Sequence, residues 1–450
     1  MKKIILLFFF LCNFLPGYSQ EKTYSFTMDE AVRFGIENNR IANNASRDVE
    51  AAKKQQWETI AEGLPQISAK IDYQNYLKQQ VSLIPAEFFG GQPGEFSEVI
   101  FGTKQNATAT ATLKQLIFDG SYLVGLQSSK VFLEISQNAK EKTDLQIRQQ
   151  IIQTYGNVLL SEESLRISEN NVNTLRKNVE ETKKILENGL TEEEDLEQLQ
   201  ITLANLETEY SNLKRLVNLA YKMLNISLGL PIDKQITLTD TLETLTMKNV
   251  DNPFESSSFE IQDNIDYKIA FNNKRSKELL VKLEKSRALP TLDGFINGGY
   301  QAFSDEFTFF NGDQQWFGNS LLGLSLQIPI FSSLQRSART QRAKIDLEKA
   351  EAELNETEQQ LKFEYEKALS DYQFAIEQYI TSKKNLDLAE RIERKNQIKY
   401  TEGLASSFEL RQAQLQLYSS QREFLQAMIN VITAQTILET IQFSGKLFKQ

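Results

Sequence analysis

Residues 196–224 read LEQLQITLANLETEYSNLKRLVNLAYKML, and residues 410–438 read LRQAQLQLYSSQREFLQAMINVITAQTIL. In both stretches the core positions recur at alternating steps of three and four residues, the pattern of a helix that packs along another helix. The two stretches keep a constant offset, since 410 − 196 = 214. They therefore predict an internal duplication. The seam residues are Leu196, Leu199, Leu203, Leu206, Tyr210, Leu213, Val217, Ala220 and Leu224, and then Leu410, Ala413, Leu417, Ser420, Phe424, Ala427, Val431, Ala434 and Leu438.

A second pair of segments precedes these two and keeps the same offset. Residues seven apart from Ile151 to Leu186 are apolar, and their counterparts run from Tyr365 to Tyr400, with Glu393 as the one polar interruption. Long helices are expected from about 121 to 188 and from about 333 to 402. Gly189 and Gly403 follow them at matching places, so each half predicts a long helical hairpin.

The N-terminus has the pattern of a secretory signal peptide. Lys2 and Lys3 precede an apolar run, and Gly17-Tyr18-Ser19 offers a cleavage site before Gln20. Residues 1–19 are therefore expected to be removed. No lipid anchor is expected at Cys12, because the large residues Phe10 and Leu11 stand before it. No later stretch is expected to form a transmembrane helix.

Composition excludes several kinds of chemistry. The chain has no histidine, and its single cysteine lies in the expected signal peptide, so disulfides, thiol nucleophiles, zinc fingers and His-based acid/base catalysis are not expected. The net charge is −10, and it becomes −12 when Lys2 and Lys3 are removed, which disfavours nucleic acid as a partner. No G-x-x-x-x-G-K-[ST] loop is present. We expect no enzyme activity, no cofactor and no metal site.

Four segments alternate with period two and predict strands. Polar or small residues occupy every second position, and aromatic, Gly-containing loops join the strands within each half. Four strands cannot close a membrane barrel, for which about eight is the minimum, so strands that span a membrane would require several copies of the chain. The alternative is a soluble sheet packed on a helical body. The strands are expected near Ile67 to Tyr76, Lys104 to Phe118, Thr291 to Phe303 and Leu321 to Ile330.

These signals divide the chain into two similar halves behind the signal peptide. The expected segments are N-terminal helices at 20–62, a strand pair at 63–120, a helical hairpin at 121–230, a polar linker region at 231–260, a helix at 261–288, a second strand pair at 289–332, a second hairpin at 333–443 and a tail at 444–450.

The ordered set of motifs resembles the TolC-like outer-membrane efflux proteins over essentially the whole mature chain. The most specific matches are Asn188-Gly189-Leu190 at the first turn, and Tyr400-Thr401-Glu402-Gly403-Leu404 at the second, continuing to Leu410, Gln412 and Ala413. Leu-Pro pairs before the strand pairs, at Leu64-Pro65 and Leu289-Pro290, and Phe118 and Phe331 after them, also look like the family.

The resemblance implies a mainly α fold with a small β part. A homotrimer would form a 12-stranded barrel in the outer membrane, continued by an α-helical barrel in the periplasm. The implied function is passive conduction for a tripartite efflux pump or a type I secretion system. The implied partners are a periplasmic adaptor and an inner-membrane transporter of the RND, ABC or MFS class.

The resemblance also assigns two sets of site residues. The adaptor-docking tip would comprise Asn188, Gly189, Leu190, Glu402, Gly403 and Leu404. The entrance gate would involve Asp195, Tyr400 and Glu409, with Asp195 as an acceptor for Tyr400. Ala405 stands where the family commonly has an Arg, and Gln412 where well-known members have a second acid, so neither the salt bridge nor a double acidic ring is expected.

Simpler interpretations stand beside these. Gly189 and Gly403 fit helix-ending glycines, and the acidic run Glu192 to Asp195 stabilises a helix N-terminus without any further role. Two other protein classes remain open. A periplasmic coiled-coil adaptor or structural envelope protein would explain the hairpins, and an envelope enzyme would use carboxylates such as Asp293 and Glu306. The exported substrate is not encoded in any of these patterns.

Overall fold

The computed structural model describes residues 24–251 and 259–443. The expected signal peptide, the cleavage site before Gln20, Cys12 and the tail at 444–450 lie outside the described residues. The chain divides into two compact units. The hairpin unit holds described residues 24–45, 140–251, 259–265 and 359–443, and the sheet unit holds 46–139 and 266–358. Three long helices contribute residues to both units: α3 (Arg40–Glu62), α4 (Gly120–Glu187) and α8 (Gln335–Thr401).

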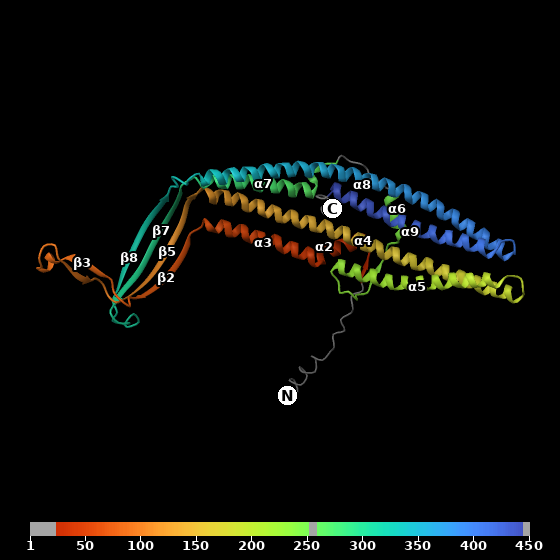
Figure 1. Cartoon of the computed structure of the whole chain (residues 1–450), viewed down its shortest axis with the longest axis horizontal. Helices are drawn as coiled ribbons and strands as arrows, with labels where there is room; N and C mark the ends of the chain where they lie inside the picture. Colours follow the sequence, from red (N-terminus) through yellow and green to blue (C-terminus); the bar gives the residue numbers. More distant parts are fainter. Residues whose placement is uncertain (1–23, 252–258, 444–450) are drawn as a thin grey trace, which may run out of the picture. The chain divides into compact units, whose positions relative to one another are not determined.

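Two helical hairpins with matching boundaries dominate the hairpin unit (Figure 1). The first is α4 (Gly120–Glu187) with α5 (Glu193–Leu228), and the second is α8 (Gln335–Thr401) with α9 (Ser407–Phe443). The first helix of each hairpin ends, and the second begins, at positions exactly 214 residues apart, since 401 − 187 = 407 − 193 = 214. The hairpins predicted from the seven-residue pattern are therefore confirmed.

Glycines end the first helix of each hairpin. Gly189 has φ +71° and Gly403 has φ +72°, a left-handed conformation that side-chain-bearing residues rarely adopt. The amide of Leu190 donates to the carbonyl of Ile185, and that of Leu404 to the carbonyl of Lys399, at 3.1 and 2.7 Å. These bonds satisfy carbonyls that the helix ends would leave unpaired. The helix-ending interpretation of both glycines is therefore confirmed.

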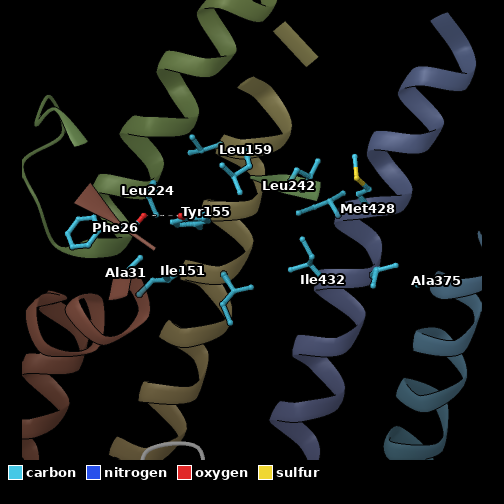
Figure 2. Packing of buried hydrophobic residues seen from close by; sticks show 14 of the residues in the cluster. Phe26, Ala31, Ile151, Tyr155, Leu159, Leu224, Leu242, Ala375, Met428 and Ile432 are labelled. Atoms are coloured by element: carbon cyan, nitrogen blue, oxygen red, sulfur yellow. Dashed lines mark hydrogen bonds between the residues drawn. The ribbon is translucent and has the colours of Figure 1, made fainter. Parts of the chain in front are cut away.

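The predicted seams form the cores of the hairpins. Every residue named for the α5 and α9 seams is buried or half-buried. Figure 2 shows how Ile151, Tyr155 and Leu224 of the first hairpin pack in one cluster with Met428 and Ile432 of the second. Burial of such apolar side chains, at about 1.5–3 kcal/mol each, is the main force that holds the hairpins together.

One helix, α9, is long and apolar enough by composition to cross a membrane, over Ser407–Gln442, among the described residues. No such helix was expected from the amino-acid sequence. The core helix of a folded protein passes the same test, and Leu410, Val431 and Leu438 of α9 are fully buried in the hairpin unit. We therefore interpret α9 as a core helix.

Short elements from distant parts of the chain complete the hairpin unit. β1 (Tyr24–Phe26) pairs in parallel with β6 (Ile236–Leu238), and α6 (Leu242–Asp251) packs on α9. The hydroxyl of Tyr155 donates to the carbonyl of Phe26 at 2.9 Å, and Asp240 accepts from the amide of Met28 at 2.7 Å. The segment expected to be a polar linker thus contains ordered structure. The unit also holds α2 (Met28–Asn38), which starts with a capping box formed by Thr27 and Glu30, and η3 (Ile261–Asp263).

The sheet unit contains a four-stranded antiparallel sheet in the order β2-β5-β7-β8. It also contains α7 (Ile265–Ser286) and those segments of α3, α4 and α8 that lie within residues 46–139 and 266–358. The strands are β2 (Gln66–Asn75), β5 (Gln105–Asp119), β7 (Thr291–Ser304) and β8 (Trp316–Gln327). The first three lie close to the predicted bounds. The fourth starts five residues before Leu321 and stops before Ile330, because Pro329 cannot donate a ladder hydrogen bond.

A second, two-stranded sheet was not predicted. β3 (Val81–Pro85) and β4 (Phe96–Ile100) form a hairpin within the segment that joins β2 to β5, with the short helix η2 (Ala86–Phe89) between them. Its Gly and Pro residues had suggested an irregular loop. Figure 1 shows this hairpin extending beyond the end of the four-stranded sheet.

Candidate functional site: the sheet faces and the hairpin tips

The two faces of the four-stranded sheet differ in polarity. The register places every second residue of each strand on one face, and those residues are apolar or small apart from Asn75, Gln105, Gln115, Ser304 and Ser320. Many are exposed, which is unusual for a contiguous apolar surface in water. We name this surface the apolar face. Its large members are Ile67, Ile71, Tyr73, Leu113, Ile296, Tyr300, Trp316, Leu322, Leu324 and Leu326.

All charged residues of the strands, apart from the helix-capping Asp119, lie on the other face. Lys70 pairs with Asp72 at 2.9 Å, and Lys114 pairs with Asp293 at 3.4 Å. Thr108, Thr110 and Thr112 accompany them on β5, although Phe295, Phe303, Phe317 and Leu321 also point to this side. Segregation of every charge to one face is what a strand between lipid and an aqueous lumen requires.

Aromatic side chains gather at the end of the sheet where β2 and β7 meet their loops. The rings of Phe307 and Phe309 contact Tyr73 at 5.5 and 5.7 Å between centroids, and Phe309 contacts Trp316. Phe309 itself is buried against Ala107 and Ala302 of the apolar face. Aromatic residues at one level of an apolar sheet face are typical of a membrane–water boundary.

The extent of the apolar face fits a membrane span. On β7 it runs from Leu292 to Ala302, about 33 Å along the strand at ~3.3 Å per residue. A strand tilt of about 40° reduces this to about 25 Å, the height of the apolar band of outer-membrane barrels. β2 and β8 each have an edge without a partner strand among the described residues, so the sheet can be extended on both sides.

The second candidate site is formed by the tips of the two hairpins. Leu190 and Leu404, which follow the two turn glycines, are 78% and 73% exposed. Asn188 and Glu402 are exposed beside them. The tips therefore expose two apolar side chains, Leu190 and Leu404, at equivalent positions, as expected of a docking surface.

The gate candidates lie between the hairpins, but with partners other than those expected. The hydroxyl of Tyr400 lies 2.6 Å from that of Thr182, and no hydrogen bond joins it to Asp195. Asp195 instead accepts from the hydroxyls of Ser407 and Thr191, the latter at 2.7 Å. Within one copy of the chain, Tyr400 thus contacts Thr182 of α4, and a role of Tyr400 and Asp195 at the entrance stays a prediction.

A third contact extends this link along the hairpins. Asn178 and Gln397 exchange two hydrogen bonds, at 3.0 and 3.2 Å. Asn178 and Thr182 are both buried, and they lie four residues apart on one face of α4. These neutral contacts were not predicted from the sequence. Asn178 and Thr182, two polar residues four positions apart beside an apolar seam, are the pattern that could have indicated them.

The pKa values of Asp195 and Tyr400 are shifted in opposite directions by their surroundings. Burial alone would raise the pKa of Asp195, but the hydrogen bonds from Ser407, Thr191 and the backbone bring that pKa below its usual value. Burial raises the pKa of Tyr400, and the nearby charges of Asp195 and Glu181 add to the effect. At neutral pH Asp195 is thus an acceptor and Tyr400 is un-ionised.

Glu409 and the acidic run have local structural roles. The carboxylate of Glu409 accepts from the amide of Ser406 at 3.0 Å, and the amide of Glu409 donates to the hydroxyl of Ser406 at 3.3 Å. This is a capping box at the start of α9. Glu193, Glu194 and Asp195 stand in the first turn of α5, where negative charge stabilises the helix.

Glu393 marks a polar layer in the seam of the second hairpin. Burial raises the pKa of its half-buried carboxyl, which faces Gln414 of α9 and the neighbouring Arg394. Gln414 is only 1% exposed, and its amide makes no hydrogen bond of good geometry, although it lies close enough to the Glu393 carboxyl to oppose part of the rise in pKa. A buried polar group without a partner costs about 1–3 kcal/mol, so this layer weakens the packing near the second tip.

No group of three or more acidic, His or Cys residues that could hold a metal occurs among residues 24–251 and 259–443. The features that stand out are instead a sheet with an apolar and a charged face, open sheet edges, and hairpin tips with exposed leucines. They define a membrane-associated, strand-and-coiled-coil protein.

Comparison with known proteins agrees with that class. Residues 273–441 match the family model described as outer membrane efflux protein. The fold is similar to that of the outer membrane protein VceC of Vibrio cholerae, with TM-score 0.71, 16% identity, and 92% and 96% of the two chains covered. It is also similar to the CmeC outer membrane channel of Campylobacter jejuni, with TM-score 0.73, 17% identity, and 93% and 86% covered.

A third solved structure, CusC, gives TM-score 0.73 at 16% identity, with 95% of each chain covered. No curated protein sequence matches significantly. Residues 273–441 thus match the outer membrane efflux protein family, and the fold of the chain is that of TolC-like outer-membrane channels. Its function is that of an outer-membrane channel component of an efflux system, located in the outer membrane and reaching into the periplasm. Family and fold are those of channel proteins rather than of known enzymes.

Proposed function

We propose that three copies of this chain form a passive conduit of a tripartite efflux pump or type I secretion system. Three four-stranded sheets would close one 12-stranded barrel, in which the open edge of β2 pairs with that of β8 of the next copy. The charged face with Lys70, Asp72, Lys114 and Asp293 would line the lumen. The observation that carries the proposal is the pair of open edges on a sheet whose exposed face is apolar.

Closure of the barrel is required by the physics of the membrane. An unpaired strand edge exposes amide and carbonyl groups, and each costs several kcal/mol in hydrocarbon. About eight strands are the fewest that close, so one copy cannot satisfy its own edges. A trimer is the smallest assembly that also accords with the implied architecture of the family.

The tips are the proposed contact with a periplasmic adaptor. Asn188, Gly189 and Leu190 of the first hairpin, and Glu402, Gly403 and Leu404 of the second, would form this docking surface. Exposure of both leucines on narrow glycine turns supports the assignment, because apolar side chains gain free energy when a partner covers them. An inner-membrane transporter of the RND, ABC or MFS class would supply the energy.

Asp195, Tyr400 and Glu409 are proposed to act at the entrance. The neutral contacts of Tyr400 with Thr182 and of Asn178 with Gln397, together with Asp195 and Ser407, would hold the two hairpins of one copy together. Opening the entrance between them would require these bonds to be exchanged for water. Glu409 would contribute charge at the entrance in addition to capping α9.

Membrane fractionation and cross-linking test the proposal. The protein is expected in the outer membrane as a heat-modifiable species on unheated gels, with a cross-linking ladder that ends at three copies. A ladder that ends at two copies contradicts the trimer. A soluble periplasmic monomer would favour the alternative functions, a coiled-coil adaptor or a structural envelope protein.

A further inference from the structure

We propose that the β3–β4 hairpin lies on the outer-membrane surface, with one face inserted among the lipids at the boundary of the bilayer. The proposal rests on the proposed membrane barrel, and it adds a lipid-binding surface outside the barrel wall. Its residues are those between the end of β2 at Asn75 and the start of β5 at Gln105.

The hairpin exposes an apolar face of its own. Its register places Val81 opposite Ile100, Leu83 opposite Glu98, and Pro85 opposite Phe96, so these six residues share one side. All of them are exposed, and Leu83 and Phe96 are each 64% exposed. Phe88, Phe89 and Phe101 are also exposed nearby. We name this surface the hairpin face.

Nothing within the described part of the chain covers the hairpin face. β3 and β4 make their main contacts with each other and with η2. A two-stranded hairpin is at best marginally stable in water, so its apolar side gains stability from another apolar phase or protein. An exposed apolar patch of this kind marks a surface that binds a membrane or a partner.

The hairpin leaves the sheet at the level of the membrane boundary. Tyr73 on β2 and Ala107 on β5 belong to the aromatic cluster at that level, and the two strands end two residues beyond them. The backbone amide of Tyr76 bonds to the carbonyl of Lys104 at 2.9 Å, and the amide of Lys104 bonds to Asp305 at 2.9 Å. These bonds hold the root of the hairpin beside the aromatic loop, so the nearest apolar phase is the bilayer.

Charge favours the lipid boundary over a second copy of the chain. Glu98 lies within the hairpin face, Glu87 and Glu95 flank it, and no Lys or Arg occurs between Lys78 and Lys104. A dry contact between identical hairpins would bury like charges without partners, which is costly. At the headgroup layer the carboxylates stay hydrated while the Phe and Leu side chains reach the acyl boundary.

Tryptophan fluorescence in reconstituted vesicles tests the inference. The background carries Trp57→Phe and Trp316→Phe, which remove both native tryptophans. Three variants then each carry one tryptophan: Leu83→Trp on the hairpin face, Ser97→Trp on the opposite side of the hairpin, and Leu324→Trp on the apolar face of the sheet. Each protein is reconstituted as the full chain in phosphatidylcholine brominated either near the headgroup or deep in the acyl chain, after its oligomer is checked on unheated gels.

Leu83→Trp is expected to lose emission most with bromine near the headgroup, Ser97→Trp to lose little, and Leu324→Trp to be quenched by bromine within the bilayer. If Leu324→Trp is quenched but Leu83→Trp is not, the lipid inference is overturned while the barrel stands. Blue-shifted Leu83→Trp emission would then indicate cover by protein, and red-shifted emission would indicate water. Equal quenching of Leu83→Trp and Ser97→Trp overturns the assignment to one face. If Leu324→Trp is not quenched, the result contradicts the proposed membrane barrel itself.

Discussion

The first hairpin, α4–α5, and the second, α8–α9, turn at positions 214 residues apart, but their seams near the tips differ. Val179 of α4 corresponds to Glu393 of α8, and Leu199 of α5 corresponds to Ala413 of α9. Leu199 is fully buried in the first hairpin, whereas the carboxyl of Glu393 lies beside the buried amide of Gln414 in the second. Nearly equal helix lengths and matching turns therefore do not imply equal stability of the two tips.

The difference indicates how the two tips are held. Apolar burial within the hairpin holds the first tip. The second tip has a weaker seam, and it depends more on the hydrogen bonds of Gln397, Tyr400 and Ser407 to the first hairpin. We infer that the second tip opens locally at a lower free-energy cost. The following substitutions test this difference between the tips, from the largest expected effect to the smallest.

Leu199→Ala should remove most of the advantage of the first tip. Truncation of a buried Leu costs about 2–5 kcal/mol, because transfer free energy is lost and a cavity remains. Hydrogen exchange measured by mass spectrometry should then accelerate in peptides near residue 199 and change little near residue 413. Truncation of the exposed Leu216 to Ala is the matched control. Unchanged exchange near residue 199 would contradict the assigned role of the seam.

Glu393→Leu should strengthen the second tip by about 1–3 kcal/mol at neutral pH, since it removes a charge from the seam. Val179→Glu, the reverse change in the first hairpin, should weaken that tip. Burial raises the pKa of Glu393, so the folded seam favours the protonated form. The stability that protonation contributes is complete below the ordinary pKa of 4.5 and is lost as pH rises through the raised pKa.

The benefit of Glu393→Leu should therefore shrink when exchange is measured in acid. A benefit that is equal in acid and at neutral pH would show that charge at Glu393 is not the cause. Glu393→Gln, which removes the charge and keeps the shape, should give part of the gain at neutral pH.

Gly403→Glu should reduce export of a fluorescent substrate while oligomer abundance on unheated gels stays near normal. A side chain at φ +72° costs about 1–2 kcal/mol, and a charge would be desolvated in the proposed adaptor contact. Gly189→Glu should act similarly at the first tip. Gly403→Asn is the control, because Asn tolerates this conformation and carries no charge. Loss of the oligomer in Gly403→Glu would falsify the docking assignment.

Ser407→Ala should have the smallest effect, about 1 kcal/mol, because it removes one of the hydrogen bonds that Asp195 accepts. The pKa of Asp195 is lowered, so the stability it contributes is present above its ordinary value of 3.8 and is lost as pH falls through the lowered value. In Ser407→Ala the pKa of Asp195 should rise, so the folded protein should take up this proton at higher pH. Single-channel conductance of the reconstituted protein during acid titration measures it, and an unchanged titration argues against a link between Asp195 and Ser407.

Much of the fold was predictable because its signals are local. The seam residues around Leu199 and Leu410 follow the helical period, Gly189 and Gly403 mark the turns, and alternation located β2, β5 and β7 within a few residues. The hairpin β3–β4 was missed because Gly and Pro in its connecting loop indicated irregular chain. The start of β8 was misplaced because Gly318 and Asn319 weaken its strand pattern.

The contacts of the candidate gate were harder to predict. The family resemblance suggested Asp195 for Tyr400, whereas Thr182 lies nearer. Asp195 and Thr182 can each form a hydrogen bond with the phenol hydroxyl of Tyr400. Residue type alone therefore does not predict which of them is the partner. The choice depends on the relative rotation and height of α4 and α8, which small side-chain differences along the whole hairpin decide.

The amino-acid sequence by itself determined the duplicated hairpins, their turns and the two-faced strands, because each depends on periodicity and backbone preferences over a few neighbouring residues. The tertiary structure alone decided which polar groups meet between the hairpins, the parallel pairing of β1 with β6, and the common side of Lys70, Asp72, Lys114 and Asp293. Those features join residues far apart in the chain. Their geometry is set by how entire elements pack, and no short stretch of sequence contains that information.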